Sequence, residues 1–242
     1  MRCSSDTQTL LLNGMSVGAI AAQDAFLHES RAQGHRLVGY KIALLDPQER
    51  ARLGAAGPAW GQLTDDMALV DGAEFGLSAV ASAEAEVDLV FQLGDDLVGP
   101  GVTEADALAA TWALHVGIEI PAVPLGSQAA ADVETFISRN TFASKYIVGR
   151  AVTDFTRVDM SLIGAIVEVD GNVVSSGCGA RVLGSPARAV AWLANGLAVH
   201  GKELHAGMLV FTGALADPVT LTAGRRVSVE IAHFGRAAIS AA

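Results

Sequence analysis

Three acidic side chains alternate with apolar residues in the segment Glu84-Ala85-Glu86-Val87-Asp88. In a β-strand successive side chains point to opposite faces, so Glu84, Glu86 and Asp88 would point the same way. Like charges on one face are unfavourable unless a positive charge compensates them. Carboxylate oxygens are the ligands that hard divalent cations prefer. The spacing therefore indicates a metal site, although a solvated strand face would give the same pattern.

A lone carboxylate in an apolar segment supports the metal interpretation. Glu119 is flanked by Ile118 and Ile120, which give little reason for an isolated charge. The residues that follow Asp88 are Leu89-Val90-Phe91, which read as buried, so the acidic face should lie near a pocket. We therefore predict that Glu84, Glu86 and Glu119 bind one divalent ion. The alternative for Glu119 is a buried acid paired with Arg or Lys.

Lys41 is the one cation in the apolar run from Val38 to Leu44. A buried lysine needs a partner, and burial lowers its pKa. Lys41 is therefore a candidate acid/base group or anchor for a substrate carboxylate. The alternative is an ordinary ion pair, with Asp65 or Asp66 as the partner.

Other reactive residues lack a supporting pattern. Gly177-Cys178-Gly179 lacks the third glycine that a dinucleotide-binding loop requires at a fixed distance. Cys178 has no histidine at a spacing that identifies a partner, so a quiet thiol is expected. Two cysteines, Cys3 and Cys178, cannot build a tetrahedral zinc site alone.

Composition limits the classes of protein and of partner. The chain has 242 residues, of which 51% are hydrophobic and 17% are charged, which predicts a folded core rather than disorder. A net charge of -10 without a basic cluster opposes nucleic-acid binding. No apolar run reaches about 18 residues, and the segment Leu10–Ala22 is interrupted by polar residues and glycine. We expect a cytoplasmic protein without a membrane span or a signal peptide.

Periodicity and turn residues predict a helical arm followed by a strand-rich domain. We place the arm at residues 1–36 and the catalytic domain at residues 37–242. One face of the first helix should carry Ile20, Ala21, Phe26 and Leu27, opposite Gln23, Asp24 and Glu29. Hairpin turns are predicted at Asp71-Gly72 and Asp170-Gly171. The expected helices are Val17–Gly34, Pro47–Leu53, Glu104–Leu114, Ala131–Arg139 and Pro186–His200, and the main strands are Leu37–Leu44, Ala83–Leu93, His115–Ala122, Leu162–Val169, Val173–Ser176, Met208–Thr212 and Val227–His233.

Several stretches together resemble the 2-oxopent-4-enoate hydratase family, which includes the 4-oxalocrotonate decarboxylases and belongs to the fumarylacetoacetate hydrolase superfamily. The resemblance runs in the family's order from about Val17 to the end of the chain. The stretches are Leu37-Val38-Gly39-Tyr40-Lys41-Ile42, Asp66-Met67, Val70-Asp71-Gly72-Ala73-Glu74, Glu84-Ala85-Glu86, Val98-Gly99-Pro100, Ile118-Glu119, Asp170-Gly171-Asn172-Val173-Val174, Gly177 to Gly184, and Ala189-Val190-Ala191-Trp192-Leu193-Ala194-Asn195.

The resemblance implies a fold, a cofactor and a set of site residues. The fold is of the α+β class, with a mixed, mostly antiparallel rolled β-sheet of the fumarylacetoacetate hydrolase C-terminal type and helices packed outside. The cofactor is Mg²⁺ or Mn²⁺. The implied metal ligands are Glu84, Glu86 and Glu119, the implied catalytic residues are Lys41 and Asp66, and the implied substrate contacts are Asn140, Thr212 and Gly213.

The departures from the family concern the substrate wall. Where the family has Asp-Ser-Arg after the third metal ligand, this chain has Pro121-Ala122-Val123. Leu45-Asp46 replaces a Thr-Ser pair, and Ala216 replaces a threonine. An apolar wall predicts better activity on 2-oxo acids with a neutral tail than on dicarboxylates, because unpaired polar groups are costly to bury. Arg139 could supply the missing charge.

The expected activity is that of a metal-dependent lyase of the hydratase type, acting on a small 2-oxo or 2-hydroxydienoic acid. The metal would act as a Lewis acid on the carboxylate and 2-oxo oxygens of the substrate. Decarboxylation, C–C hydrolysis of an acylpyruvate, or a degenerate assembly subunit are the alternatives. The expected partner is the small-molecule substrate, with neither nucleic acid nor membrane, and the chain is expected to form a homo-oligomer.

Overall fold

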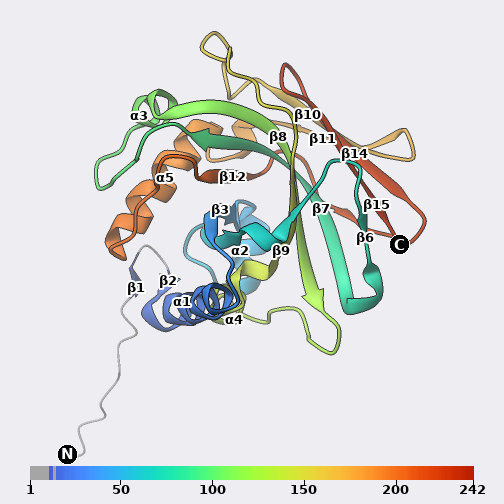
Figure 1. Cartoon of the computed structure of the whole chain (residues 1–242), viewed down its shortest axis with the longest axis horizontal. Coiled ribbons are helices and arrows are strands. Elements are labelled where there is room, and N and C mark those ends of the chain that lie inside the picture. Colours follow the sequence, from blue (N-terminus) through green and yellow to red (C-terminus); the bar gives the residue numbers. More distant parts are fainter. Residues whose placement is uncertain (1–10, 13–14) are drawn as a thin grey trace, which may run out of the picture.

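The computed structural model describes residues 11–12 and 15–242 (Figure 1). Predictions that concern residues 1–10, including Cys3, lie outside the described residues. The helices are α1 (Val17–Ala32), α2 (Pro47–Leu53), α3 (Glu104–Ala109), α4 (Val133–Ser138) and α5 (Pro186–Val199). The strands are β1 (Leu11–Leu12), β2 (Met15–Ser16), β3 (Leu37–Ala43), β4 (Ala59–Thr64), β5 (Ala68–Leu69), β6 (Glu74–Phe75), β7 (Val80–Leu93), β8 (Thr111–Pro124), β9 (Ala143–Val148), β10 (Gly164–Val169), β11 (Asn172–Cys178), β12 (Leu209–Ala214), β13 (Val219–Thr220), β14 (Arg226–Ile231) and β15 (Gly235–Ala241).

Two curled sheets form the frame of the molecule. The larger has the order β4-β3-β12-β7-β8-β9-β5, with β13 paired to β7, and the smaller has the order β11-β10-β14-β15-β6. The pairs β12–β3, β5–β9 and β15–β6 are parallel and the remaining ones are antiparallel. Figure 1 shows β7 and β8 sweeping across the fold, with α1 and α4 side by side below the curled sheet and α5 beside α3. The predicted fold class, α+β with a mixed, mostly antiparallel rolled sheet, is confirmed.

Local capping explains why α2 forms where the sequence predicts it. The Asp46 carboxylate accepts hydrogen bonds from the backbone N–H groups of Gln48 and Glu49 at 2.6 and 3.2 Å. Pro47 occupies the first helical turn, where its missing N–H costs nothing. Gly54 ends the helix in the left-handed conformation, with φ of 68°. The Asp that departs from the family's Thr-Ser pair is thus the N-cap of a helix.

The helix predicted from Thr103 to Leu114 is wrong at its C-terminal end. The capping box of Thr103 and Asp106 is present, but α3 ends at Ala109 and β8 begins at Thr111. β8 is a 14-residue strand that pairs with β7 along most of its length. Long-range pairing with β7 therefore overrides the local helical pattern of this segment.

Two further local predictions are wrong for the same kind of reason. Asp71-Gly72 does not form a hairpin, because β5 pairs with β9 while β6 pairs with β15. The predicted polar side of α1 includes Gln23, which is buried. Its amide donates to the carbonyl oxygens of Trp60 and Ile137 at 2.9 and 3.0 Å, so it ties α1 to β4 and α4. The helix of the predicted N-terminal arm is thus packed onto the rest of the fold.

The hairpin predicted at Asp170-Gly171 is confirmed, since β10 and β11 pair across it. The helix predicted from Pro186 is confirmed as α5. Among the described residues, no helix is both long and apolar enough to cross a membrane.

Candidate metal centre and catalytic cavity

A cavity of about 320 Å³ lies where α2, β3 and the long β7–β8 pair meet. Its charged lining consists of Lys41, Glu49, Arg52, Glu84, Glu86 and Arg181, with Asp46 at the start of α2. The predicted wall of Pro121, Ala122 and Val123 also lines it, together with Ala130, Phe136 and Phe142. The cavity therefore combines an acidic side with an apolar side, as a site for a small organic acid and a cation requires.

The register of β7 and β8 brings two of the predicted ligands together. Glu86 lies directly opposite Glu119 in the antiparallel pair, and side chains in such positions are cross-strand neighbours. Glu119 is buried, Glu86 is half-buried, and Glu84 is exposed two residues farther along the same face. Glu84 and Glu86 thus line the cavity, whereas Glu119 is not among its lining residues and lies in the interior opposite Glu86.

Lys41 reaches Glu119 from a strand that is not its neighbour. Its Nζ lies 3.0 Å from Oε2 of Glu119, although β12 and β7 separate β3 from β8 in the sheet. Three strand spacings amount to about 14 Å in a flat sheet, so the contact depends on the curl of the sheet. The alternative pairing of Lys41 with Asp65 or Asp66 is wrong, whereas a Glu119 paired with a lysine is confirmed.

Buried acidic groups outnumber buried basic groups around Lys41. Lys41, Asp88 and Glu119 are all buried, and each is at most 2% exposed. Oε1 of Glu119 and Oδ2 of Asp88 are buried and have no hydrogen-bond partner within the described part of the chain. More negative than positive groups therefore meet in a region of low dielectric constant, where a further cation would be stabilised.

The pKa values of these groups reflect that imbalance. Burial, and next the Glu119 carboxylate, raise the pKa of Glu86 well above its usual range. Burial, and next Glu119, raise the pKa of Asp88 to about 7, against the lowering effect of the Gly213 N–H. Burial also raises the pKa of Glu119, opposed by Lys41. Burial lowers the pKa of Lys41, but Glu119, Glu86 and Asp88 outweigh it and leave that pKa above its ordinary value.

A hard divalent cation fits this donor set. Carboxylate oxygens are its preferred ligands, and the orphaned Oε1 of Glu119 is an available one. The oxygens of Glu84, Glu86 and Glu119 do not form a group in which all atoms lie within 4.8 Å of one another. Binding by all three would therefore draw their side chains closer together. Metal binding requires ionised carboxylates, so it must also displace the protons that the raised pKa values retain.

The raised pKa of Asp88 predicts how the stability of the metal-free protein depends on pH. A carboxyl group whose folded pKa is about 7, against an unfolded value of about 4, binds more protons when folded. Its contribution to the free energy of unfolding is full below pH 4 and is lost as pH rises through 7. We expect that loss, roughly a few kcal/mol, to disappear in Asp88→Asn. Urea unfolding in chelator at pH 5 and pH 7.5 measures it, and an equal loss in both proteins would contradict it.

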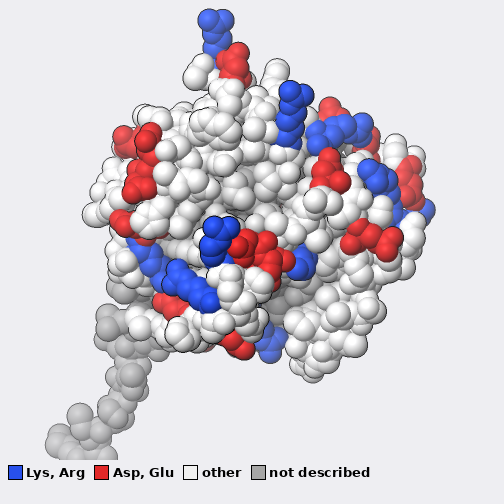
Figure 2. Space-filling view, viewed as in Figure 1, with Lys and Arg blue, Asp and Glu red and all other residues white. Residues whose placement is uncertain are grey.

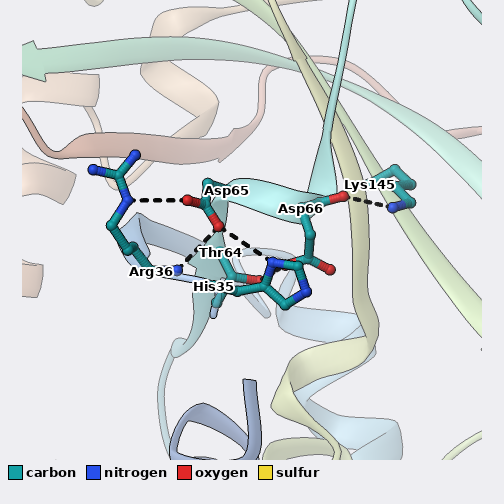
Figure 3. Close-up of polar contacts among 6 residues, drawn as sticks. All are labelled: His35, Arg36, Thr64, Asp65, Asp66 and Lys145. Atoms are coloured by element: carbon teal, nitrogen blue, oxygen red, sulfur yellow. Dashed lines mark hydrogen bonds and ion pairs between the residues drawn. The ribbon is translucent and has the colours of Figure 1, made fainter. Parts of the chain in front are cut away.

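The structure does not bring Asp66 to this cavity. Asp66 follows β4, and Thr64 pairs with Leu37 at the end of β3 that is farther from the cavity-lining residues Ala43 and Leu44. Figure 3 shows Asp66 beside His35, Asp65 and Arg36. Thr64 Oγ1 donates to Asp66 Oδ1 at 2.6 Å, and Arg36 donates to both oxygens of Asp65. Ligand atoms of His35, Asp65 and Asp66 lie within 4.8 Å of one another, but these carboxylates already have protein donors.

The three predicted substrate contacts, Asn140, Thr212 and Gly213, form hydrogen bonds within the protein. The side chain of Asn140 accepts from the Gln62 N–H at 2.7 Å and donates to the Gln62 carbonyl at 2.8 Å. Thr212 is buried and donates to the Leu89 carbonyl at 2.8 Å. Gly213 donates its N–H to Asp88 Oδ1 at 2.5 Å. None of these three residues lines the cavity, whereas Thr141, next to Asn140, does.

Gly213 occupies a position that excludes a side chain. Its φ is +99°, and a Cβ would lie 2.3 Å from the side chain of Leu45. It sits in a bulge of β12, where pairing with β7 shifts register between Phe211 and Ala214. At this bulge the Gly213 N–H is free of the β12–β7 ladder and donates to the Asp88 carboxylate. The resemblance to the family at Thr212-Gly213 therefore reflects a backbone conformation that requires glycine.

Sequence reasoning missed three charged residues of the cavity: Glu49, Arg52 and Arg181. The signal for two of them was present, since α2 was predicted and residues three apart share a helix face. The Glu49 carboxylate is half-buried and has no hydrogen-bond partner in the described chain. Burial raises its pKa, against the opposing charges of Lys41 and Arg52.

Both arginines are exposed at the cavity and have other contacts. Arg181 forms an ion pair with Asp217 at 2.5 Å, and Arg52 donates to the Ala130 carbonyl at 3.4 Å. Arg139, which could have supplied the missing charge, lies outside this cavity and donates to the Gln128 carbonyl. The predicted wall of Pro121, Ala122 and Val123 thus carries no charge, but the cavity contains two further cations, each already engaged. On the face shown in Figure 2, basic and acidic side chains lie next to each other and do not form a broad positive field.

Comparisons with known proteins agree with this geometry. The chain is 33% identical over 228 residues to a 2-hydroxyhexa-2,4-dienoate hydratase of Comamonas testosteroni, covering 91% of this chain and 86% of that protein. It is 34% identical to the TodF product hydratase of Pseudomonas putida, covering 90% and 81%. A 4-oxalocrotonate decarboxylase of Pseudomonas putida is 30% identical, with 84% and 76% covered.

A solved structure shares the fold closely. The 4-oxalocrotonate decarboxylase of Pseudomonas putida G7, complexed with magnesium and adipate, superposes with a TM-score of 0.86 at 27% identity, covering 94% of this chain and 87% of that one. The family model described as fumarylacetoacetate (FAA) hydrolase C-terminal matches residues 63–240. The chain belongs to the fumarylacetoacetate hydrolase family.

Proposed function

We propose that this protein is a divalent-metal-dependent hydro-lyase that adds water to a small unsaturated 2-oxo acid. The observation that carries the proposal is the cavity in which Glu86, opposite Glu119, faces Lys41 and the separate carboxylate of Glu49. The hydratase relatives at 33 and 34% identity support the reaction class.

Glu84, Glu86 and Glu119 are the residues that would hold Mg²⁺ or Mn²⁺. When bound there, the ion would supply Lewis-acid stabilisation of negative charge on the substrate's 2-oxo and carboxylate oxygens. The ionised glutamates would hold it in place, and Lys41, which hydrogen-bonds Glu119 in the metal-free structure, would supply a positive charge at the cavity. The apolar residues Pro121, Ala122 and Val123 would exclude water from one side of the substrate.

Glu49 is the residue that we assign to water activation. A 2-hydroxy-2,4-dienoate first becomes a 2-oxo-3-enoic acid by losing its 2-hydroxyl proton and gaining a proton at carbon 5. The water oxygen then bonds to carbon 4 while one water proton passes to the Glu49 carboxylate. The π-electron pair between carbons 3 and 4 moves toward the 2-oxo group, and a proton returned to carbon 3 restores the ketone. Glu49 is suited to this role because its carboxylate has no competing hydrogen bond and burial raises its pKa. Asp66 does not line the cavity, so we assign it no direct part.

Glu49 also favours a second candidate, C–C hydrolysis of an acylpyruvate. That reaction too needs a base for water, and the same carboxylate could serve. The two reactions are separated by their products. Incubation of purified enzyme and Mg²⁺ with 2-hydroxypenta-2,4-dienoate, followed by NMR, should give a 4-hydroxy-2-oxo acid. Pyruvate release from an acylpyruvate, without hydration of the dienoate, would replace the first proposal by the second.

We expect the enzyme to prefer substrates whose end remote from the 2-oxo acid group is neutral. The cavity arginines are exposed and engaged, and the wall at Pro121–Val123 has no hydrogen-bonding side chain. We expect kcat/KM to be at least about tenfold higher for 2-hydroxyhexa-2,4-dienoate than for a dienoate with a terminal carboxylate, since an unpaired buried charge is costly. Steady-state kinetics with both substrates measure the ratio. A preference for the dicarboxylate would assign its binding to Arg52 or Arg181.

Replacement of Lys41 by methionine should lower turnover while metal binding persists. The substitution keeps most of the unbranched side chain but removes the ammonium that lines the cavity and pairs with Glu119 in the metal-free structure. We expect kcat to fall about 100-fold, as when an oriented charge is lost from an active site. Calorimetry with Mn²⁺ and steady-state assays test both halves. An unchanged kcat would remove Lys41 from the mechanism, and loss of metal binding would make it part of the metal site.

The homo-oligomer, the cytoplasmic location and the choice between Mg²⁺ and Mn²⁺ stay predictions.

A further inference from the structure

Asp88 is a buried carboxylate that the proposed mechanism does not use. It lies on β7, two residues beyond Glu86 on the same face, and is 1% exposed. Oδ1 accepts the Gly213 N–H at 2.5 Å, whereas Oδ2 is buried and has no partner within the described residues. A carboxylate oxygen that is buried without a hydrogen bond is costly, so its retention calls for a physical explanation.

Asp88 lies on a strand between the strand of Lys41 and the strand of Glu119. Lys41 is on β3 and its partner Glu119 is on β8, and the strands between them are β12 and β7. β7 carries Asp88, and the neighbouring strand β12 carries Gly213, whose N–H donates to the Asp88 carboxylate. The charges of Lys41 and Asp88 act on each other in both directions. The ammonium therefore interacts electrostatically with Glu119, Glu86 and Asp88, and of these three it hydrogen-bonds Glu119.

Metal binding would disturb the existing ion pair. Glu119 is the hydrogen-bond partner of Lys41 in the structure and also a proposed metal ligand. A dication at Glu119 repels a neighbouring ammonium, and a buried ammonium that loses its partner is strongly destabilising. Lys41 then needs a second anion within reach of the same buried position. Asp88 offers one, because Oδ2 has no other partner.

We propose that Asp88 is the alternate ion-pair partner of Lys41, which receives the ammonium when Glu119 binds the metal ion. Asp88 is in this sense a positioning residue: it holds Lys41 beside the cavity and leaves Glu119 free to coordinate. The inference rests on the metal site of the proposed function but not on the identity of the substrate. It also gives a reason for the bulge at Gly213, whose N–H fixes the other oxygen of the Asp88 carboxylate.

The test is a double-mutant cycle read by metal affinity. Mn²⁺ is titrated by calorimetry into the wild type, Asp88→Asn, Lys41→Met and the double variant. Asparagine keeps an acceptor for the Gly213 N–H but cannot neutralise an ammonium. We expect Asp88→Asn to weaken Mn²⁺ binding at least about tenfold, because Lys41 stays on Glu119 and competes with the metal. In the Lys41→Met background the same substitution should change affinity by less than about twofold, since no ammonium needs a partner.

Controls separate this inference from the proposed function. Asp95→Asn removes one exposed acidic charge just beyond β7 and should leave Mn²⁺ affinity unchanged. An equal loss from Asp88→Asn in the wild type and in Lys41→Met would show that Asp88 acts on the metal directly. No loss in the wild type would show that Lys41 remains on Glu119. Either result overturns the inference. A wild type that binds no Mn²⁺ would instead refute the metal site itself. A crystal structure with Mn²⁺ should place Lys41 Nζ within hydrogen-bond distance of Asp88 Oδ2.

Discussion

Replacement of Glu86 by glutamine is expected to abolish binding of Mg²⁺ and Mn²⁺, and turnover with it. Glu86 lies opposite Glu119 and lines the cavity, so it is the proposed ligand between the buried Glu119 and the exposed Glu84. Glutamine keeps the shape but removes the charge that a hard dication requires. The loss of affinity should exceed about 100-fold, the upper range for residues that only support a ligand. Calorimetry with Mn²⁺ measures it.

The matched control for Glu86→Gln is Glu74→Gln, because Glu74 is an exposed glutamate on β6 in the other sheet. That variant should bind Mn²⁺ as the wild type does. Glu84→Gln should show a smaller loss than Glu86→Gln, since Glu84 is exposed and water can replace its oxygen. Unchanged affinity in Glu86→Gln would remove Glu86 from the site and with it the basis of the proposed metal centre.

The second large effect is expected at Glu49, where glutamine should lower kcat for hydration by about 10²- to 10⁴-fold, the usual contribution of a general acid or base. Metal affinity should stay within about twofold of the wild type, since Glu49 is on α2 and not on the strands of the metal site. A base must be ionised, so wild-type kcat/KM should fall as pH drops through the pKa of Glu49, which burial raises. With Mg²⁺ kept saturating at each pH, so that protonation of the metal ligands is not limiting, the variant should lack that acidic limb. Steady-state assays from pH 4.5 to 8 measure both effects.

Gln48→Ala is the control on the same helix, because Gln48 is exposed and does not line the cavity. It should keep both kcat and the shape of the pH profile. If Glu49→Gln retained the wild-type rate and profile, water activation would have to come from another group in the cavity. A simple loss of folding is separated from this result by the metal titration, which a misfolded variant would fail.

Much of the local structure could be predicted from residue patterns alone. The alternation of Glu84, Glu86 and Asp88 indicated one face of a strand, and Asp46-Pro47 together with Gly54 marked both ends of α2. Asp170-Gly171 marked the hairpin between β10 and β11. These features depend on the backbone preferences of a few neighbouring residues, so they can be predicted from the sequence of that segment. The same local reading extended α3 beyond Ala109, because nothing in that segment reports its pairing with β7.

The composition of the site was decided by the tertiary structure. Strand order and curl bring Lys41 across two strands to Glu119, and register sets Glu86 opposite that same residue. The direction of β4 carries Asp66 away from the cavity, while the rotation of α2 turns Glu49 into it. A sequence specifies which side chains share a face of one element. Which faces meet, and which charges must then share a buried volume, follows only from packing between elements distant in the chain.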